Sequence, residues 1–302
     1  MSTQSLSAEL PALRRQGIFF CVVACLALAC TPLLAIVNDQ YVLICAGLAI
    51  FFLGVPHGAL DTVFARKIYR LNTPLQWLIF TAAYVSLAAA IVVIWWVAPR
   101  IFLASFLLIS AFHFSADPVI PLSMGARMLY GGAVMILPAM LHAPQITVLF
   151  AQLVGIAAAD DIVSVLQAAS IPWLIADLIL VGVVLRTDRV AGCEILGAVL
   201  LALLASPLIA FTLFFCVMHS PRHFLRTALL VGEAPKNLLM RAAFVPTAAC
   251  FFASLLAMSL STHLPIDDRF VRIIFVGLAA LTVPHIAIVE RVRYRGWRFK
   301  SD

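Results

Sequence analysis

The sequence predicts an all-α fold: a polytopic membrane helix bundle made by a single integral membrane domain that covers residues 1–302. Hydrophobic residues make up 64% of the chain and charged residues 11%, whereas soluble domains contain about 25% charged residues. The apolar runs are continuous and do not alternate with polar residues, which favours helices over the strands of a membrane barrel. No polar block between the runs is long enough to fold as a separate domain.

Eight to ten of these runs are predicted to be transmembrane helices, and ten are preferred, because a spanning helix needs roughly 20 apolar residues. Pro138 and Pro144 leave a second interpretation open, in which residues 123–158 form one kinked helix. Residues 219–232 could form a further short helix. The ten predicted spans are residues 16–37, 41–65, 75–97, 101–118, 123–141, 144–158, 171–186, 193–217, 241–260 and 268–289.

Basic residues next to the spans predict that both termini are cytoplasmic, as expected for a multi-pass protein of the cell inner membrane. Arg14 and Arg15 precede the first span, and three basic residues follow the second span within residues 66–70. Residues 1–15 are then a cytoplasmic N-terminal segment. Arg186 and Arg189 would face the opposite side in a ten-span arrangement, which counts against that arrangement.

A basic tail, residues 290–302, follows the last predicted span and contributes much of the net charge of +6. Such a tail could bind nucleic acid. Because it contains Tyr294 and Trp297 and comes directly after a span, we expect it to be cytoplasmic and to contact lipid headgroups, with no nucleic-acid partner.

Histidine and aspartate recur at matched spacings near the ends of apolar runs. His57 and Asp61 are four residues apart in VPHGALD (55–61). His113 and Asp117 repeat that spacing in AFHFSADP (111–118). Residues four apart share one face of a helix. An aspartate one turn from a metal-ligating histidine can accept the second ring N–H and fix the orientation of the ring.

A third motif, HSPRH (219–223), places His219 and His223 four residues apart, which lets two imidazoles of one helix reach one metal ion. Ionisable residues inside spans are rare and usually functional. Imidazoles without thiolates suit iron, copper or zinc. The sequence therefore predicts a histidine-lined metal site within the bundle, with a proton path as the alternative.

The remaining polar residues leave several interpretations open. Asp61 and Asp117 could instead relay protons or form salt bridges with Arg66 or Arg222. Arg222 is a candidate site residue but could also be a cytoplasmic anchor. His285 lies in an apolar run after a proline and is a further candidate ligand. His142 and His263 fit ordinary interfacial histidines, and the seven cysteines fit small buried residues rather than ligands or disulfides.

The motifs together resemble the Brp/Blh family of membrane-embedded β-carotene 15,15′-dioxygenases from bacteria and archaea. The residues that carry the resemblance, which extends roughly from residue 40 to residue 290, are PHGALD (56–61), FHFSADP (112–118), HSPRH (219–223) and PH (284–285). The resemblance implies an Fe²⁺-dependent oxygenase that uses O2 to cleave the central double bond of β-carotene into two molecules of all-trans-retinal. It implies His57, His113, His219 and His223 as iron ligands, with His285 matching a further motif.

An apolar polyene dissolves in the bilayer, so a site within the helices that opens laterally to lipid is expected. Candidate walls of a substrate tunnel are the phenylalanine-rich stretches 51–52, 102–114, 211–215 and 251–252. Because the family supplies retinal to rhodopsins, the resemblance also implies a functional link to a retinal-binding rhodopsin.

Two other classes of membrane protein could contain such residues. Di-iron desaturases use more histidine clusters than this chain offers, since it has seven histidines in all and one H-x-x-x-H pair. A transporter or channel could use the histidines and aspartates for metal-ion or proton passage. Bound iron and a cavity of substrate length would favour the oxygenase.

Overall fold

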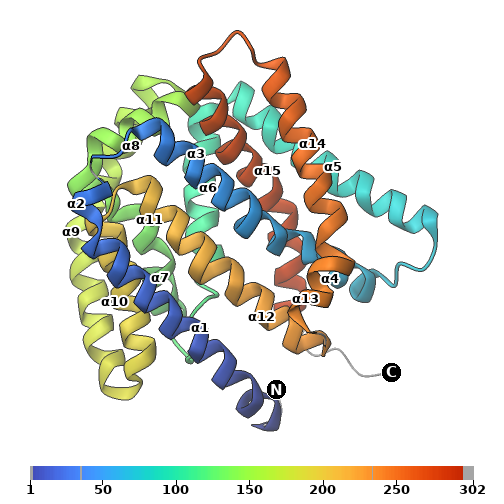
Figure 1. The fold of residues 1–302 in the computed structure, drawn as a ribbon, viewed down its shortest axis with the longest axis horizontal. Coiled ribbons are helices and arrows are strands. Elements are labelled where there is room, and N and C mark those ends of the chain that lie inside the picture. Colours follow the sequence, from blue (N-terminus) through green and yellow to red (C-terminus); the bar gives the residue numbers. More distant parts are fainter. Residues whose placement is uncertain (1–2, 35, 233, 295–302) are drawn as a thin grey trace.

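The computed structural model describes residues 3–34, 36–232 and 234–294, and in these ranges every regular element is a helix (Figure 1). The predicted tail therefore lies mostly outside the described residues. The α-helices are α1 (Thr3–Ala29), α2 (Thr31–Leu34), α3 (Asp39–Ala49), α4 (Asp61–Tyr69), α5 (Pro74–Val97), α6 (Pro99–Phe114), α7 (Met124–Ile136), α8 (Pro138–Val154), α9 (Ile156–Thr187), α10 (Arg189–Leu204), α11 (Pro207–Leu213), α12 (Ser220–Val231), α13 (Pro235–Leu238), α14 (Phe244–Leu260) and α15 (Ile266–Tyr294).

The all-α membrane bundle is confirmed. Within the described ranges, seven helical segments are long and apolar enough to cross a membrane, and the bent pair α7–α8 raises this to eight. That number is the lower end of the predicted eight to ten. Helices α6 and α10 are not among these segments, because each has only 16 residues.

Two predicted spans have the wrong boundaries. The predicted span 193–217 is divided, because α10 ends at Leu204 and Pro207 begins a new helix. The predicted span 171–186 is only part of α9, which has 32 residues. Residues 123–158 follow the kinked-helix alternative, since α7 and α8 meet at a bend of 45°.

The position of Arg186 and Arg189 differs from the one that the ten-span prediction gave them. Asp188, which lies between α9 and α10, forms an ion pair with Arg14 of α1 at 2.5 Å. The turn that contains Arg186 and Arg189 therefore lies at the same end of the bundle as Arg14. The ten-span assignment placed this turn on the opposite side because it counted residues 123–158 as two crossings.

Two long helical rods depart from α-helical geometry at their histidines. In residues 39–69, a π-helical turn η1 (Ile50–Gly54) and a 3-10 turn η2 (Val55–Leu60) join α3 to α4. In residues 207–231, a second π-helical turn, η3 (Phe214–His219), joins α11 to α12. Pro56 and Pro221 lack the backbone N–H that a regular helix interior needs, so each lies where the hydrogen-bond pattern changes. Residues 219–232 thus continue a long rod and are not a separate short helix.

The bundle has a packed half and a half exposed to lipid. The main apolar core lies between α1, α7, α9, α10 and the α11–α12 rod, where the largest buried residues include Phe20, Tyr130 and Phe214. On the other side, α5 and α14 have no buried residues (Figure 1). The histidine-bearing elements lie between these two halves.

Close packing of α6 against α7 depends on Gly131, because a Cβ atom there would collide with the carbonyl oxygen of Ala111. We expect Gly131→Ala to lower the free energy of unfolding by about 1–3 kcal/mol, as overpacking generally does. The measurement is thermal or denaturant unfolding of the purified protein in detergent. Gly125→Ala in the same helix is the control, because its Cβ would meet no atom within 4 Å. Equal stability of the two variants would contradict the close packing at Gly131.

Candidate metal centre

Five histidines converge between the packed and the lipid-exposed halves. They come from four segments: His57 from η2, His113 from α6, His219 and His223 from the α11–α12 rod, and His285 from α15. All five are buried, with at most 7% of each residue exposed. The structure thus brings together the four histidines implied as ligands and the further candidate His285.

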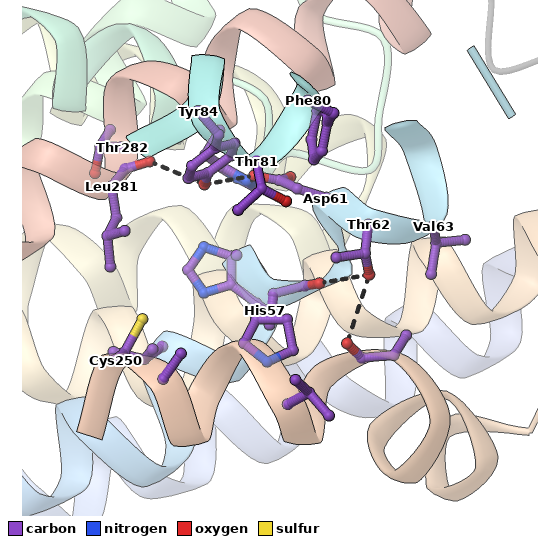
Figure 2. A pocket seen from close by; sticks show the side chains of 18 of the residues that line it. His57, Asp61, Thr62, Val63, Phe80, Thr81, Tyr84, Cys250, Leu281 and Thr282 are labelled. Carbon is purple, nitrogen blue, oxygen red and sulfur yellow. Dashed lines mark hydrogen bonds and ion pairs between the residues drawn. The ribbon is translucent and has the colours of Figure 1, made fainter. Parts of the chain in front are cut away.

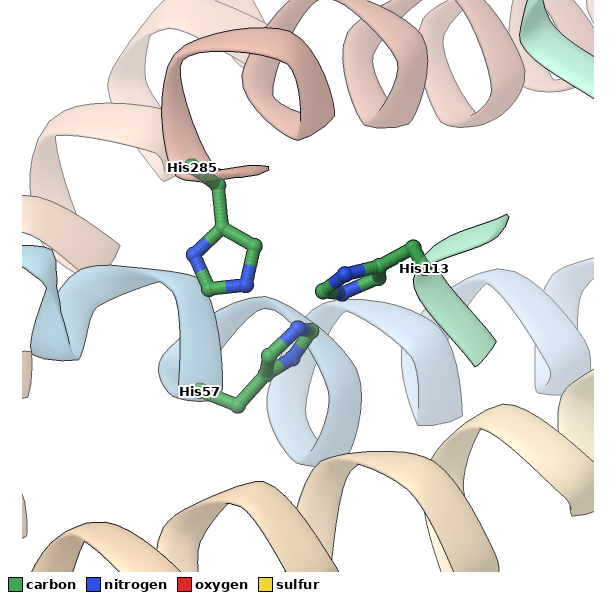
Figure 3. A group of neighbouring side chains, drawn as sticks. All are labelled: His57, His113 and His285. Carbon is green, nitrogen blue, oxygen red and sulfur yellow. The ribbon is translucent and has the colours of Figure 1, made fainter. Parts of the chain in front are cut away.

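The five rings form one cluster. Their centroids are 4.6 Å apart for His113 and His219, 5.0 Å for His57 and His219, and 5.1 Å for His223 and His285. Figure 3 shows that His57, His113 and His285 point toward a common centre from three different segments. One ring nitrogen of each of these three lies within 4.8 Å of the other two, an arrangement that could hold a metal ion.

The ring nitrogens at the centre have no protein partner. The Nε2 atoms of His113, His219, His223 and His285 are buried and make no hydrogen bond to the described residues. A buried polar atom without a partner costs free energy. A cation bound by these nitrogens would remove that cost. A donor set of imidazole nitrogens without thiolates suits iron, copper or zinc, so the residues present fit the implied Fe²⁺.

The outward-facing nitrogens of three histidines are paired. The Nδ1 atom of His285 lies 2.7 Å from Oδ1 of Asp61, and that of His219 lies 3.0 Å from Oδ1 of Asp117. The Nδ1 atom of His57 lies 2.5 Å from the carbonyl oxygen of Gly54. An Nδ1–H group that donates to an oxygen leaves Nε2 free to bind a metal. This tautomer is assigned from the hydrogen-bond partners.

The aspartates lie next to histidines of other segments and not next to those of their own motifs. Asp61 was expected beside His57 but pairs with His285, and Asp117 was expected beside His113 but pairs with His219. The reason is local geometry. His57 lies in a 3-10 turn, and α6 ends at Phe114, so Asp117 is outside the helix. In neither motif do the two residues share one face of an unbroken α-helix.

Asp61 is held from a second side by α5. The hydroxyl group of Tyr84 donates a hydrogen bond of 2.9 Å to Oδ2 of Asp61 (Figure 2). The other carboxylate oxygen of Asp61 bonds to His285. This role of Tyr84 could not be predicted from the sequence, because residues 75–97 form an apolar run without a charged residue.

Arg222 is fully buried, so the interpretation as a cytoplasmic anchor is wrong. Its guanidinium group pairs with Glu194 of α10 at 2.8 Å and donates to Oε1 of Gln16 in α1 at 2.8 Å. It also donates to the backbone carbonyl of Asp117 at 3.2 Å. Arg222 therefore links α1 and α10 to the segment that carries Asp117.

Two further arginines bind the same backbone segment. Arg226 donates to the carbonyl oxygens of Ala116 and Asp117 at 2.7 and 2.9 Å, and to that of Pro118 at 3.3 Å. Arg127 donates to the carbonyl of Ser115 at 2.8 Å. The last carbonyls of a helix have no partner within the helix, and cations near that end are favourable. These contacts fix the segment after α6 and, with it, the carboxylate that holds His219.

His142 and His263 lie outside the cluster. His142 is at the kink inside α8, and His263 is exposed in the turn before α15. All seven cysteines are free, and none belongs to the candidate metal group.

The histidine cluster lies on the wall of a large cavity of about 1630 Å³, between α4, α5, α14 and α15. His57, His113 and His285 line it, together with Asp61 and Tyr84 (Figure 2). Phenylalanines of α6 and of the α11–α12 rod line one end, and the exposed Arg66 and Arg70 line the other.

The fold and the site define a class of protein: a polytopic helical membrane protein with a buried histidine cluster suited to a metal ion beside a large internal cavity. The family model described as beta-carotene 15,15′-dioxygenase matches residues 48–292. The chain therefore belongs to the β-carotene 15,15′-dioxygenase family, and the resemblance to Brp/Blh proteins is confirmed.

A curated relative supports the same family. The protein named beta-carotene 15,15′-dioxygenase from uncultured marine bacterium 66A03 is 28% identical over 261 residues. The alignment covers 82% of this chain and 92% of that relative. No solved structure matches the chain.

Arg226→Met removes three contacts to the backbone that carries Asp117, so we expect His219 to be held less firmly. Loss of a group that orients a ligand commonly lowers metal affinity by about 10–100-fold. The measurement is titration of the purified metal-free protein with Co²⁺, whose visible spectrum reports the number of ligands.

Arg272→Met is the matched control for this prediction. Arg272 also donates to a backbone carbonyl, that of Gln152, at 2.9 Å, but it does not contact the histidine cluster. Equal Co²⁺ affinities in the two variants would show that Arg226 has no specific effect on the centre.

Proposed function

We propose that this protein is an iron-dependent dioxygenase that cleaves the central 15,15′ double bond of β-carotene with O2 and releases two molecules of all-trans-retinal. The observation that carries the proposal is the position of the histidine cluster beside a cavity of about 1630 Å³, which His57, His113 and His285 line and which extends in two directions from them. Membership of the β-carotene 15,15′-dioxygenase family supports this function over the transporter or channel alternative.

The course of the helices indicates that the cavity extends to both sides of the histidine cluster. The histidine-bearing segments all run downward in Figure 1. Phe106 and Leu278, which line the cavity, each precede a cluster histidine by seven residues, which is about 10 Å along a helix. Arg66 follows His57 by nine residues, about 14 Å in the opposite direction. A cluster between two arms suits the cleavage of a polyene near its middle.

His57, His113, His219 and His223 are the proposed iron ligands, and His285 is proposed as a further ligand. Bound iron supplies the chemistry that activates dioxygen. The cavity walls hold the polyene and exclude water, while Asp61 and Asp117 accept the outer N–H groups of His285 and His219. Asp61 and Asp117 thereby fix which nitrogen of each ring faces the metal.

The proposed setting is the inner membrane with both termini cytoplasmic. The start of α1, the end of α4 and the end of α15 all lie toward the lower side of Figure 1. Arg66 lies in the last turn of α4 and Arg70 directly follows that helix, so basic residues gather at that end of α4, which agrees with the positive-inside rule. We extend the proposal to delivery of the retinal product to a retinal-binding rhodopsin.

Expression in bacteria that make β-carotene should bleach the orange colour and produce retinal. The measurement is the retinal and β-carotene content of the cells by chromatography. His219→Ala should abolish the bleaching, and His263→Ala, whose side chain is exposed and outside the cluster, should not. Unchanged colour with well-expressed wild-type protein would exclude β-carotene as the substrate.

Asp117→Asn should retain partial iron binding and lower the turnover rate by about 10–100-fold, because the amide is a weaker acceptor for the N–H group of His219. Iron content and rate are measured on the same purified sample. Asp188→Asn is the control, since Asp188 pairs with Arg14 outside the cluster. An unchanged rate in Asp117→Asn would assign Asp117 a purely structural role.

A further inference from the structure

Three aromatic rings form a ladder that leads away from the histidine cluster. Phe211, Phe215 and His219 are spaced four residues apart along the α11–α12 rod. The rings of Phe211 and Phe215 are 5.5 Å apart with an interplanar angle of 9°, and those of Phe215 and His219 are 5.8 Å apart at 15°. Four residues overshoot one turn of an α-helix and fall short of one turn of the wider π-helix. The α-to-π change at Phe214 therefore keeps the three rings on one side of the rod.

A second cavity begins where this ladder ends. It has a volume of about 70 Å³ and lies between α6, α8, α11 and α15. Its walls consist of apolar residues only, among them Phe106, Leu107, Leu149, Phe211 and Phe275. A polar or charged group would lose its hydration there without gaining a partner.

Phe106 and Phe211 separate the two cavities, because they line both. Both side chains are half-buried. Phe106 stacks on Phe102 at 6.3 Å, and Phe211 packs against Phe275 at 5.7 Å. A rotation of either ring would join the small cavity to the large one. These two side chains thus form part of the wall between the cavities.

We propose that the ladder and the second cavity bind one half of the polyene, with the conjugated chain along Phe215 and Phe211 and the cyclic end in the second cavity. This inference rests on the proposed function and adds the binding site for one end of the substrate. Phe211 precedes His219 by eight residues, so the second cavity begins about 12 Å from the cluster along the rod. The cyclic end enters only when Phe106 and Phe211 move apart, because 70 Å³ is too small for a substituted six-membered ring in addition to the chain.

The two arms of the binding site then impose different requirements on the two ends of the substrate. The arm past Arg66 and Arg70 ends at exposed basic residues, so it sets no apolar limit on length. The arm past Phe211 ends inside the bundle and is closed by apolar side chains. The closed arm therefore limits the length of the half that enters it, whereas the open arm tolerates chains of different length.

The test compares two substrates in a variant that fills the second cavity. Leu107→Trp places a larger side chain in that cavity, and Leu108→Trp is the control, because Leu108 is 70% exposed on the lipid-facing side of the same helix. The substrates are β-carotene and a β-apocarotenal shortened at one end. The shortened molecule can place its ring in the open arm and its short end toward the filled cavity.

We expect Leu107→Trp to lower kcat/KM for β-carotene by roughly tenfold or more, since even small losses of fit in an apolar site cost about 10–200-fold. The value for the apocarotenal should change little, and Leu108→Trp should leave both values unchanged. Binding of each polyene to the metal-free protein, followed by its visible absorption, should show the same selectivity without turnover.

Two outcomes would overturn the proposed arm. An equal loss for both substrates would mean that the substitution disturbs the fold, and no loss for either would mean that the second cavity takes no part in binding. Leu149→Phe, which reduces the same cavity from α8, repeats the test if Leu107→Trp fails to fold. If the wild-type protein cleaves neither polyene, the proposed function is overturned, and so is the proposed binding site for one half of the substrate.

Discussion

The burial of five imidazole rings in an apolar interior is the constraint on which the rest of this structure depends. Each ring has two nitrogens, and a buried nitrogen without a partner is costly, above all where lipid surrounds the protein. The protein supplies partners on the outer side of three rings through Gly54, Asp61 and Asp117. The Nε2 atoms of His113, His219, His223 and His285 have no partner among the described residues, and this is the physical basis for a metal ion at the centre.

The departures from α-helical geometry serve the same arrangement. Two rods, residues 39–69 and 207–231, lie side by side, and their irregular turns η1 and η3 contact each other (Figure 1). Gly54 allows the ring of Phe215 to approach, because a Cβ there would collide with that ring. The hydroxyl group of Ser220 donates to the carbonyl of Leu53 at 2.6 Å, which satisfies an acceptor in the π-helical turn. The irregular turns therefore bring His57 and His219 to the same centre, with their ring centroids 5.0 Å apart.

The candidate site was largely predictable because ionisable residues are rare in so apolar a chain. The five clustered histidines were all candidates: matched spacings separated four of them from His142 and His263, and His285 was a further candidate because it lies in an apolar run after a proline. The partners of Asp61 and Asp117 were not predictable, because helical spacing describes neighbours within one helix and these pairs join different helices. The family motifs could not resolve this either, since PHGALD (56–61) and FHFSADP (112–118) each contain both a histidine and an aspartate.

The errors in the predicted fold also have identifiable causes in the sequence. Hydropathy merged α10 with α11 because the break at Ser206–Pro207 is short and its surroundings are apolar. Arg222 resembled a headgroup anchor because its partners, Glu194 and Gln16, are distant in sequence. The available signal was Glu194 itself, a lone acid within an apolar run, which needs a buried cation as its partner.

The two sides of the histidine cluster are held by different halves of the bundle. His219 is held through Asp117 by a segment that Arg222 and Arg226 bind from the packed half. His285 is held through Asp61 by Tyr84, which belongs to the lipid-exposed helix α5 and lines the large cavity. Asp61 therefore joins α5 to α15 through two hydrogen bonds, one from Tyr84 and one with His285. The arginine contacts join the backbone at Asp117 to the packed half instead, so the two aspartates tie the cluster to opposite halves of the bundle.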